Sequence, residues 1–201
     1  MSGLRERKKQ ATREALMTAA LRLALERGLQ NVRVEDIAAE AGVSPRTYNN
    51  YFSSKHEAII ARHVDRVRRS VAALRARPPE EPFWEALTEA VVEPWAQGIG
   101  GPGAALDPEV LASTRMLADE PALRAEALQA VFASEDELVA AIAERTGTDP
   151  VRDLYPSLVA VAVTAVVQAA IEHWLRSDPP VPFVPLLRDA LRALAAGLPV
   201  P

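Results

Sequence analysis

The chain has 201 residues, 49% of them hydrophobic and none of them cysteine. This length allows one large domain or a small domain followed by a medium one, with ample apolar material for a core. The lack of cysteine excludes a disulfide framework and a thiolate metal site. Alanine and leucine dominate, and alternating runs of the strand type are scarce, so we predict an all-α fold with about nine helices.

The formal net charge of −4 hides two parts of opposite sign. Residues 1–77 contain 16 Lys plus Arg and 8 Asp plus Glu, a net charge of +8, whereas residues 78–201 have a net charge of −12. Because neutralising phosphates drives most non-specific DNA affinity, the basic first part indicates that nucleic acid binds at that end. The alternative explanation is a chance clustering of solvated charge.

The chain begins with a basic stretch, which we expect to form a loose arm over residues 1–7 that follows a DNA backbone or stays solvated. A helix is predicted from Glu6 to Arg27, because apolar residues recur at helical spacing and Gly28 ends the run. We expect its apolar stripe to be buried. That stripe contains Leu16, Ala19, Ala20, Leu23 and Ala24.

The next stretch, VEDIAAEAGVSPRTYNNYFSSK over residues 34–55, predicts two short helices joined by a tight turn. Gly42 supplies a left-handed residue that ends the first helix. Ser44 can cap a second helix, and Pro45 is tolerated at its first position, so this helix should run to about Phe52. Two short helices connected in this way are typical of a DNA-binding helix-turn-helix, whose second helix lies in the major groove.

The second of these helices separates an inward face from a polar face. Large rings can face inward, which leaves four polar side chains outside: Arg46, Thr47, Asn49 and Asn50. Arginine and asparagine carry donors and acceptors that match the edges of guanine and adenine. On the residues alone, a tight helical hairpin with no role in DNA binding fits nearly as well.

The segment GVSPRTYNNYFSSKHEAI resembles the stretch that marks the TetR family of one-component bacterial repressors. The shared features are the Gly-Val-Ser turn, the aromatic-Phe pair and the Ser-Lys entry into the next helix, and the likeness covers residues 5–59. In this family the first helix braces the reading helix. The DNA-binding residues that the resemblance implies are Arg33, Ser44, Pro45, Arg46, Thr47, Asn49, Asn50, Tyr51 and Lys55.

Two positions depart from the family's pattern. Where members usually have a threonine that caps the second helix and touches a phosphate, this chain has Arg33, so only the phosphate contact is expected. Where members often have a tyrosine and a histidine in the reading helix, this chain has Asn49 and Asn50. Amide readout of adenine is therefore expected in place of an aromatic phosphate contact.

A fourth helix is predicted from about Ser54 to Arg77, where two prolines stop it. We place the domain boundary at its start, with a DNA-binding domain over residues 1–53 and a helical ligand-binding and dimerisation domain over residues 54–201. Because the fourth helix is continuous, it can pass motion between the domains. We expect His63 on this helix to be packed or half-exposed and not a pH switch, because no second histidine or carboxylate pair is in register.

The remaining chain predicts helices separated by prolines and glycines. They cover residues 82–97, 107–118, 121–146, 150–177 and 184–196. The glycine-rich loop at 98–103 lacks the GKS or GKT ending of a phosphate-binding loop, so we interpret it as a connector.

Aromatic residues are concentrated after Pro78, and large rings can wall a ligand cavity, although they more often fill a core. In TetR relatives the sixth helix lines the effector pocket. We therefore expect an apolar chamber with few fixed charges, with Arg115 and Arg124 as the nearest cations, although surface positions suit both better. The ligand-binding residues predicted on this basis are Trp84, Leu87, Trp95, Met116, Leu117, Phe132 and Gln168.

The last two helices are the predicted dimer interface. The helix over 158–175 is apolar nearly all round, and the last helix offers apolar residues at matching spacing: Val184, Leu187, Leu191, Leu194 and Leu198. In TetR relatives two such helices from each chain form a four-helix interface, although the same residues could complete the core of a monomer. We favour a homodimer because a helix-turn-helix of this class reads two half-sites about 34 Å apart.

The expected function is therefore that of a cytoplasmic repressor that binds a palindromic operator in double-stranded DNA and is released by a small, largely apolar effector. The SPRTYNNYF run also resembles a subgroup proposed to respond to acyl-coenzyme A-like ligands. A DNA-binding dimer without an effector is the alternative. An enzyme fits least, because HExxH and GxSxG motifs are missing, and we expect no cofactor or metal. No leader begins the chain, and the apolar run at 158–171 is shorter than the roughly 20 residues of a membrane span.

Overall fold

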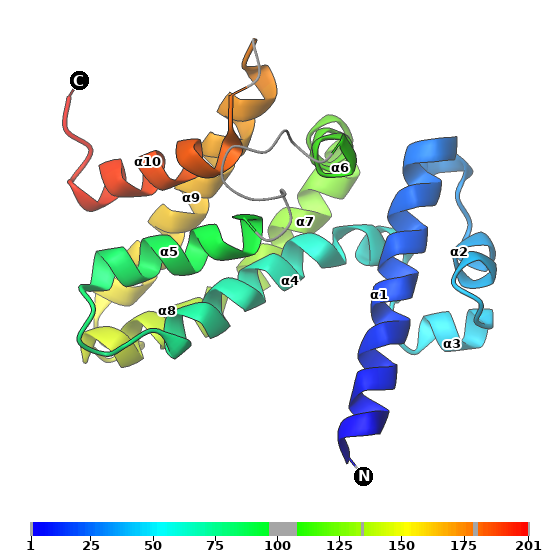
Figure 1. Ribbon diagram of the computed structural model, residues 1–201, viewed down its shortest axis with the longest axis horizontal. Helices are drawn as coiled ribbons and strands as arrows, with labels where there is room; N and C mark the ends of the chain where they lie inside the picture. The colour runs from blue at the N-terminus through cyan, green and yellow to red at the C-terminus, as the bar shows by residue number, and fades with distance from the viewer. Residues whose placement is uncertain (1, 97–107, 134, 179–180, 201) are drawn as a thin grey trace.

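The computed structural model describes residues 2–96, 108–133, 135–178 and 181–200, and all regular elements in these residues are helical (Figure 1). The all-α prediction is confirmed. The amino-terminal part contains α1 (Ser2–Arg27), the 3₁₀ turn η1 (Leu29–Asn31), α2 (Val34–Glu40) and α3 (Pro45–Asn49). The rest contains α4 (Lys55–Ala76), α5 (Phe83–Ala96), α6 (Pro108–Asp119), α7 (Pro121–Ala133), α8 (Glu135–Thr146), α9 (Leu154–Arg176) and α10 (Phe183–Ala195).

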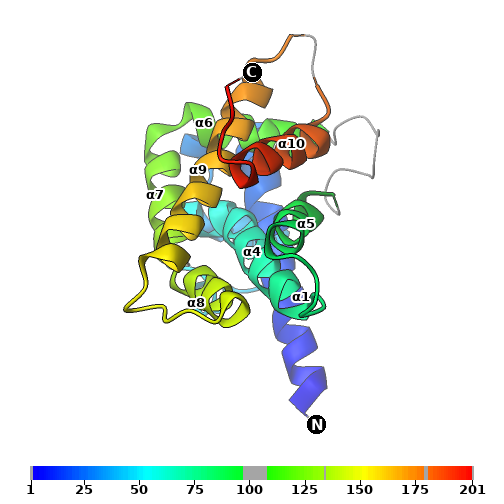
Figure 2. The same cartoon turned by 90° about the vertical axis from the view of Figure 1, so that its left-hand side faces the viewer.

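The basic amino-terminal stretch is helical, and the predicted loose arm is wrong for the residues that the structure describes. Helix α1 begins at Ser2, and its first turns extend beyond the rest of the chain (Figures 1 and 2). Once a helix has nucleated, adding a residue costs little, and no proline interrupts this segment. The basic side chains are exposed along these turns: Arg5, Arg7, Lys8 and Lys9.

Buried side chains form two clusters that meet along α4. The first unites α1, α2, α3 and residues 58–61 of α4, and Leu123 and Ala127 of α7 also belong to it. The second unites the later part of α4 with α5, α8, α9 and α10. Helix α4 therefore contributes to both cores, and the division of the chain at residues 53 and 54 stays a prediction.

The segment 121–146 was expected as one helix but forms two, which run in different directions (Figure 2). After Pro121 at its start the segment has no proline or glycine, so the apolar periodicity alone does not reveal the break. Ser134, between the two, lies outside the described residues. Acidic side chains fill the first turn of α8, where the helix dipole favours negative charge, and this pattern marks a helix start.

Two other predicted helices are shorter than expected. Helix α3 ends at Asn49, because the chain turns there and the N–H of Tyr51 donates to the carbonyl of Tyr48 at 2.8 Å. Helix α9 begins at Leu154 because Asp149 holds a turn before it, accepting hydrogen bonds from two following backbone N–H groups at 2.8 and 3.0 Å. The remaining predicted helices agree with the structure to within two residues at each end.

Helix α9 extends beyond both ends of the apolar run at 158–171 that the sequence shows. By length and composition alone, its 23 residues could cross a membrane, and only a third of its most apolar window is buried inside the chain. The exposed side of α9 presents a stripe at three- and four-residue spacing. This stripe consists of Leu158, Val161, Ala165 and Ala169.

Candidate DNA-binding surface and ligand cavity

The start of α3 is built by local features that the sequence predicted. Gly42 has a φ of +68°, a conformation that suits glycine and ends α2. Ser44 is the N-cap of α3, and its Oγ accepts a hydrogen bond from the N–H of Thr47 at 3.1 Å. Pro45 occupies the first turn. These contacts fix the direction in which the short helix leaves the turn.

One face of α3 is anchored in the core by aromatic rings. Tyr48 is fully buried, and its hydroxyl donates a hydrogen bond to the carbonyl of Ser54 at 2.8 Å. Burial raises the pKa of the Tyr48 hydroxyl, and the charge of Glu57 raises it further. Its ring lies 5.8 Å from that of Phe52, over which the guanidinium of Arg13 from α1 sits at 5.5 Å. Helix α1 therefore braces α3 through Phe52.

The opposite face of α3 is polar and open. Arg46, Asn49 and Asn50 are exposed, and Thr47 is half-buried with its hydroxyl 2.9 Å from that of Ser44. Exposed guanidinium and amide groups on a short helix after a tight turn are the groups that read base edges in a major groove. Three of the four predicted base-reading residues thus lie on α3, and the fourth, Asn50, is its C-cap.

The three predicted phosphate-binding residues occupy different environments. Arg33 is exposed before α2 and makes no side-chain cap; instead, its backbone N–H donates to the Asp36 carboxylate at 3.1 Å. Tyr51 is half-exposed. The ammonium group of Lys55 is partly buried and donates to two backbone carbonyls, those of Leu29 at 2.8 Å and Val32 at 2.9 Å. Lys55 therefore ties α4 to the segment between α1 and α2, a role that the sequence did not suggest.

A carboxylate from α7 connects the later helices to the base of the reading helix. Glu126 accepts a hydrogen bond from the Ser54 hydroxyl at 3.3 Å and lies 3.0 Å from Nδ1 of His56. Ser54 caps α4, and its carbonyl receives the Tyr48 hydroxyl. A continuous chain of contacts therefore runs from α7 through the start of α4 to α3.

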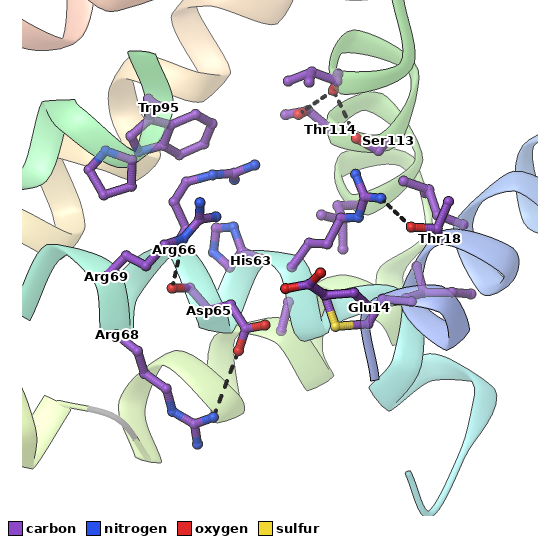
Figure 3. Close-up of a pocket in the computed structure, with 18 of the residues that line it drawn as sticks. Glu14, Thr18, His63, Asp65, Arg66, Arg68, Arg69, Trp95, Ser113 and Thr114 are labelled. Atoms are coloured by element: carbon purple, nitrogen blue, oxygen red, sulfur yellow. Dashed lines mark hydrogen bonds and ion pairs between the residues drawn. The ribbon is translucent and has the colours of Figure 1, made fainter. Parts of the chain in front are cut away.

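A cavity of about 980 Å³ lies between α1, α4, α5, α6, α7 and α9 (Figure 3). Of the predicted ligand-binding residues, Trp95, Leu117 and Gln168 line it. The structure places the others elsewhere. Leu87 is buried in the core, Trp84 packs against the same cluster, and Met116 packs against the amino-terminal cluster. The side chain of Phe132 lies outside the described residues.

The cavity is not the apolar chamber that was expected. Helix α4 lines it with arginines, including Arg62, Arg66 and Arg69, which recur every three or four residues and so share one side of the helix. Of the two cations predicted from the sequence, Arg124 lines the cavity and Arg115 is exposed outside it. The error arose because the apolar pattern of α4 does not show which polar residues the neighbouring helices enclose.

Two titratable groups on α4 are shifted by this enclosure. Burial, and then the charge of Arg66, lowers the pKa of His63 to about 4, so its imidazole is neutral at pH 7. Burial, and then the charges of Arg69 and Arg62, lowers the pKa of Arg66 to about 10, so its guanidinium keeps its charge at pH 7. His63, which we expected to be packed or half-exposed, is half-buried in the cavity wall as a neutral group.

The geometry agrees with comparisons of the whole chain with known proteins. The family model described as "Bacterial regulatory proteins, tetR family" matches residues 16–61, and the model described as "MftR C-terminal domain" matches residues 81–199. The HTH-type transcriptional regulator TcmR of Streptomyces glaucescens is 32% identical over 178 residues, which cover 88% of this chain and 79% of TcmR. The chain belongs to the TetR family of bacterial transcriptional regulators.

Solved structures of TetR-family proteins share the fold. A putative TetR-family regulator from Syntrophomonas wolfei has a TM-score of 0.66 at 19% identity, with 96% of this chain and 98% of that chain covered. FadR of Thermus thermophilus, in complex with lauroyl-CoA, has a TM-score of 0.50 at 23% identity, with 94% and 96% covered. The helix-turn-helix and the helical carboxy-terminal domain of this TetR-family regulator therefore correspond to the family's architecture.

Three functional contacts in this TetR-family chain escaped the sequence reasoning. They are the internal hydrogen bonds of Lys55, the link through Glu126, and the position of Arg66 in the cavity. Only the position of Arg66 could have been predicted from the sequence, since Arg62, Arg66 and Arg69 repeat at helical spacing beside an apolar stripe.

Proposed function

We propose that this TetR-family regulator is a repressor that binds a palindromic operator as a homodimer and leaves it when a small effector fills the cavity. The observation that carries the DNA-binding part is α3, whose Tyr48 is fully buried while Arg46, Asn49 and Asn50 are exposed. A rigid helix with these groups outside can fix two or more base pairs by bidentate hydrogen bonds. Arg33, Tyr51 and the basic first turns of α1 are placed to contact phosphates.

The homodimer is supported by the exposed stripe on α9, with Leu158 55% and Val161 50% exposed. Apolar side chains beside small alanines suit close packing against a second helix, and a second copy of α9 would remove them from water. We assign less of the interface to α10, because Leu187 and Leu191 are buried within the protomer. Their apolar pattern belongs to the monomer core, so the proposed interface is centred on α9.

Effector control is supported by the walls of the cavity. Met17 and Leu21 of α1 belong to the amino-terminal core and also line the cavity. Two contacts between α1 and α4 lie at the same place: Arg13 with Asp65, and Arg62 with the Thr18 hydroxyl at 2.7 Å. A ligand that prefers one arrangement of α1 and α4 shifts the population towards it, and with it the spacing of the reading helices.

The effector class that we propose is amphipathic and acyl-CoA-like, as in the lauroyl-CoA complex of the Thermus thermophilus relative. A dimer that binds DNA without an effector is the second candidate. It is favoured by the ion pair of Arg13 with Asp65 and the hydrogen bond of Arg62 with Thr18, which link α1 to α4 directly. As a TetR-family DNA-binding protein, the regulator would act in the cytoplasm.

The test is a selection from randomised DNA duplexes with the purified protein at moderate salt. We expect enrichment of a palindrome whose half-sites are about one helical turn, or a multiple of it, apart. The variant Asn49→Ala should lose about 1–3 kcal/mol of binding free energy on the selected site and keep its affinity for unrelated duplexes. Salt-sensitive binding without an enriched sequence, or equal losses on both DNAs, would contradict base reading by α3.

A further inference from the structure

Arg66 stands out among the side chains in the cavity because the described residues give it no acceptor. Its guanidinium lies over the ring of Trp95, 3.8 Å from the ring centroid. Other arginines nearby are engaged: Arg13 pairs with Asp65, and Arg69 donates to the Asp65 carbonyl at 3.4 Å. In the part of the chain that the structure describes, Arg66 donates no hydrogen bond and forms no ion pair.

The groups around Arg66 add positive charge and do not compensate it. The charges of Arg62 and Arg69 oppose that of Arg66, and His63 beside it is neutral at pH 7. Across the cavity, the hydroxyls of Ser113 and Thr114 donate to the carbonyl of Val110 on their own helix (Figure 3). Arg66 is half-buried, and none of the described residues accepts a hydrogen bond from its five N–H donors, so an anion that enters the cavity can pair with it.

Among the described residues that line the cavity, three are carboxylates, and none of them pairs with Arg66. Asp65 pairs with Arg13 and lies 3.8 Å from Arg68. Glu14 accepts a hydrogen bond from Gln10 at 3.1 Å on the surface of α1, and Glu6 is exposed near the start of the same helix. The positive end of the cavity therefore lies at α4 and α5, around Arg66.

Towards α1, α6 and α7 the lining is mixed. Its apolar side chains are Met17, Leu21, Ile59, Leu117, Ala127 and Leu128, and polar side chains of α1 such as Gln10, Glu14 and Thr18 lie beside them. A molecule with an anionic head on Arg66 and an apolar body along these apolar side chains would therefore match both parts of the lining. Its apolar body would contact side chains of the amino-terminal core directly.

We propose that Arg66 binds the oxyanion, a carboxylate or a phosphate, of an amphipathic effector whose apolar body extends towards α1. This inference rests on the proposed function, because it assigns the head-group site within the same cavity. Arginine suits the role, since its planar fork donates two parallel hydrogen bonds to either oxyanion while its face stays on Trp95. The anion would also draw Arg62 towards itself and away from Thr18, which would loosen α1 from α4.

The experiment compares three probes with the same chain length by isothermal titration calorimetry: decanoate, decyl phosphate and the neutral n-decanol. The full-length protein is used as wild type, as Arg66→Met, which keeps the length of the side chain without its charge, and as the control Arg115→Met. Arg115 is exposed on α6 and does not line the cavity. We expect both anions to bind wild type and the control more tightly than the alcohol does. In Arg66→Met the anions should lose about tenfold or more in affinity, and the alcohol should be unchanged.

The relative affinity of the two anions identifies the head group, and either preference supports the site. Equal binding of the anions to wild type and Arg66→Met, or an alcohol that binds as tightly as the anions, would overturn the assignment while leaving the cavity as an effector site. If none of the probes binds wild type, the class of amphipathic anions is overturned. The selection from randomised duplexes uses no ligand, so it tests the proposed DNA-binding function independently of the Arg66 assignment.

Chemical denaturation without ligand tests whether the Arg66→Met variant folds as stably as wild type. Arg66 has no hydrogen-bond partner to lose among the described residues, so Arg66→Met should unfold at the same or a higher denaturant concentration than wild type. Unfolding at a clearly lower concentration would show that Arg66 is a structural residue and would overturn the ligand role. Arg66→Lys, which keeps the charge without the fork, should recover part of the affinity for the anions.

Discussion

The ammonium group of Lys55 shows how one side chain can serve the fold where the family resemblance implied a DNA contact. Two of its three N–H donors already bond to the carbonyls of Leu29 and Val32. Lys55→Met should therefore lower the free energy of unfolding by about 2 kcal/mol, because two charge-assisted hydrogen bonds are lost and two carbonyls are left without them. Denaturant unfolding measures this loss, with the exposed Lys8→Met as the control that should leave stability unchanged.

The same variant tests the phosphate contact that stays a prediction for Lys55. If the third N–H donor of Lys55 also binds a phosphate, Lys55→Met should bind unrelated duplex DNA with a weaker salt dependence. The slope of the logarithm of the binding constant against the logarithm of the salt concentration should become shallower by about one. A full loss of stability with an unchanged slope would assign Lys55 to the fold alone. An unchanged stability would contradict the internal role.

Protonation of His63 should make stability depend on pH. Its pKa is about 4 in the folded chain and about 6.5 in the unfolded chain, so between these values only the unfolded state takes up the proton. Stability should therefore fall as pH drops from about 6.5 to 4, by at most about 3 kcal/mol from this group, and less where water in the cavity screens it. Subtracting the unfolding curves of His63→Gln from those of wild type isolates this contribution, and the exposed His173→Gln is the control. Identical pH dependence in wild type and His63→Gln would contradict the shift.

Among the elements, α7 is placed to report the state of the cavity to α3. Glu126 holds the first turn of α4 through Ser54 and His56, and neighbouring residues of α7 line the cavity. Glu126→Ala should speed amide hydrogen exchange in the first turn of α4 by about fivefold, since losing its two partly exposed contacts, with Ser54 and His56, costs about 1 kcal/mol together. Gln129→Ala, exposed on the same helix, is the control. Unchanged exchange at Glu57 and its neighbours would remove Glu126 from the link.

Across the whole molecule, the parts that the sequence predicted well depend on local signals. Gly42 ends α2 and Ser44 begins α3, as expected. A helix cap acts over a few residues, so the residue types in the sequence are enough to predict it. The direction of the Arg66 side chain and the burial of Leu187 depend instead on which helix packs over them. Those helices are distant in the sequence, so the pattern around each residue does not reveal the packing. An amphipathic stripe is equally compatible with a protomer core and a dimer interface, so α10 could not be assigned from its pattern.

The proposed dimer rests on the apolar stripe of α9 that the protomer leaves exposed. A double variant, Leu158→Glu with Val161→Glu, places two like charges on the exposed stripe of α9, where a second copy would have to desolvate them. Since both side chains are about half exposed, the protomer should keep its stability and helix content. Light scattering during size-exclusion chromatography should show a dimer for wild type and a monomer for the double variant, with loss of affinity for the palindromic site because one protomer reads only one half-site. Leu4→Glu, which changes an equally exposed leucine on α1, should remain dimeric. A wild type that is monomeric and binds lipid vesicles through α9 would instead mean that this helix is a membrane-seeking element.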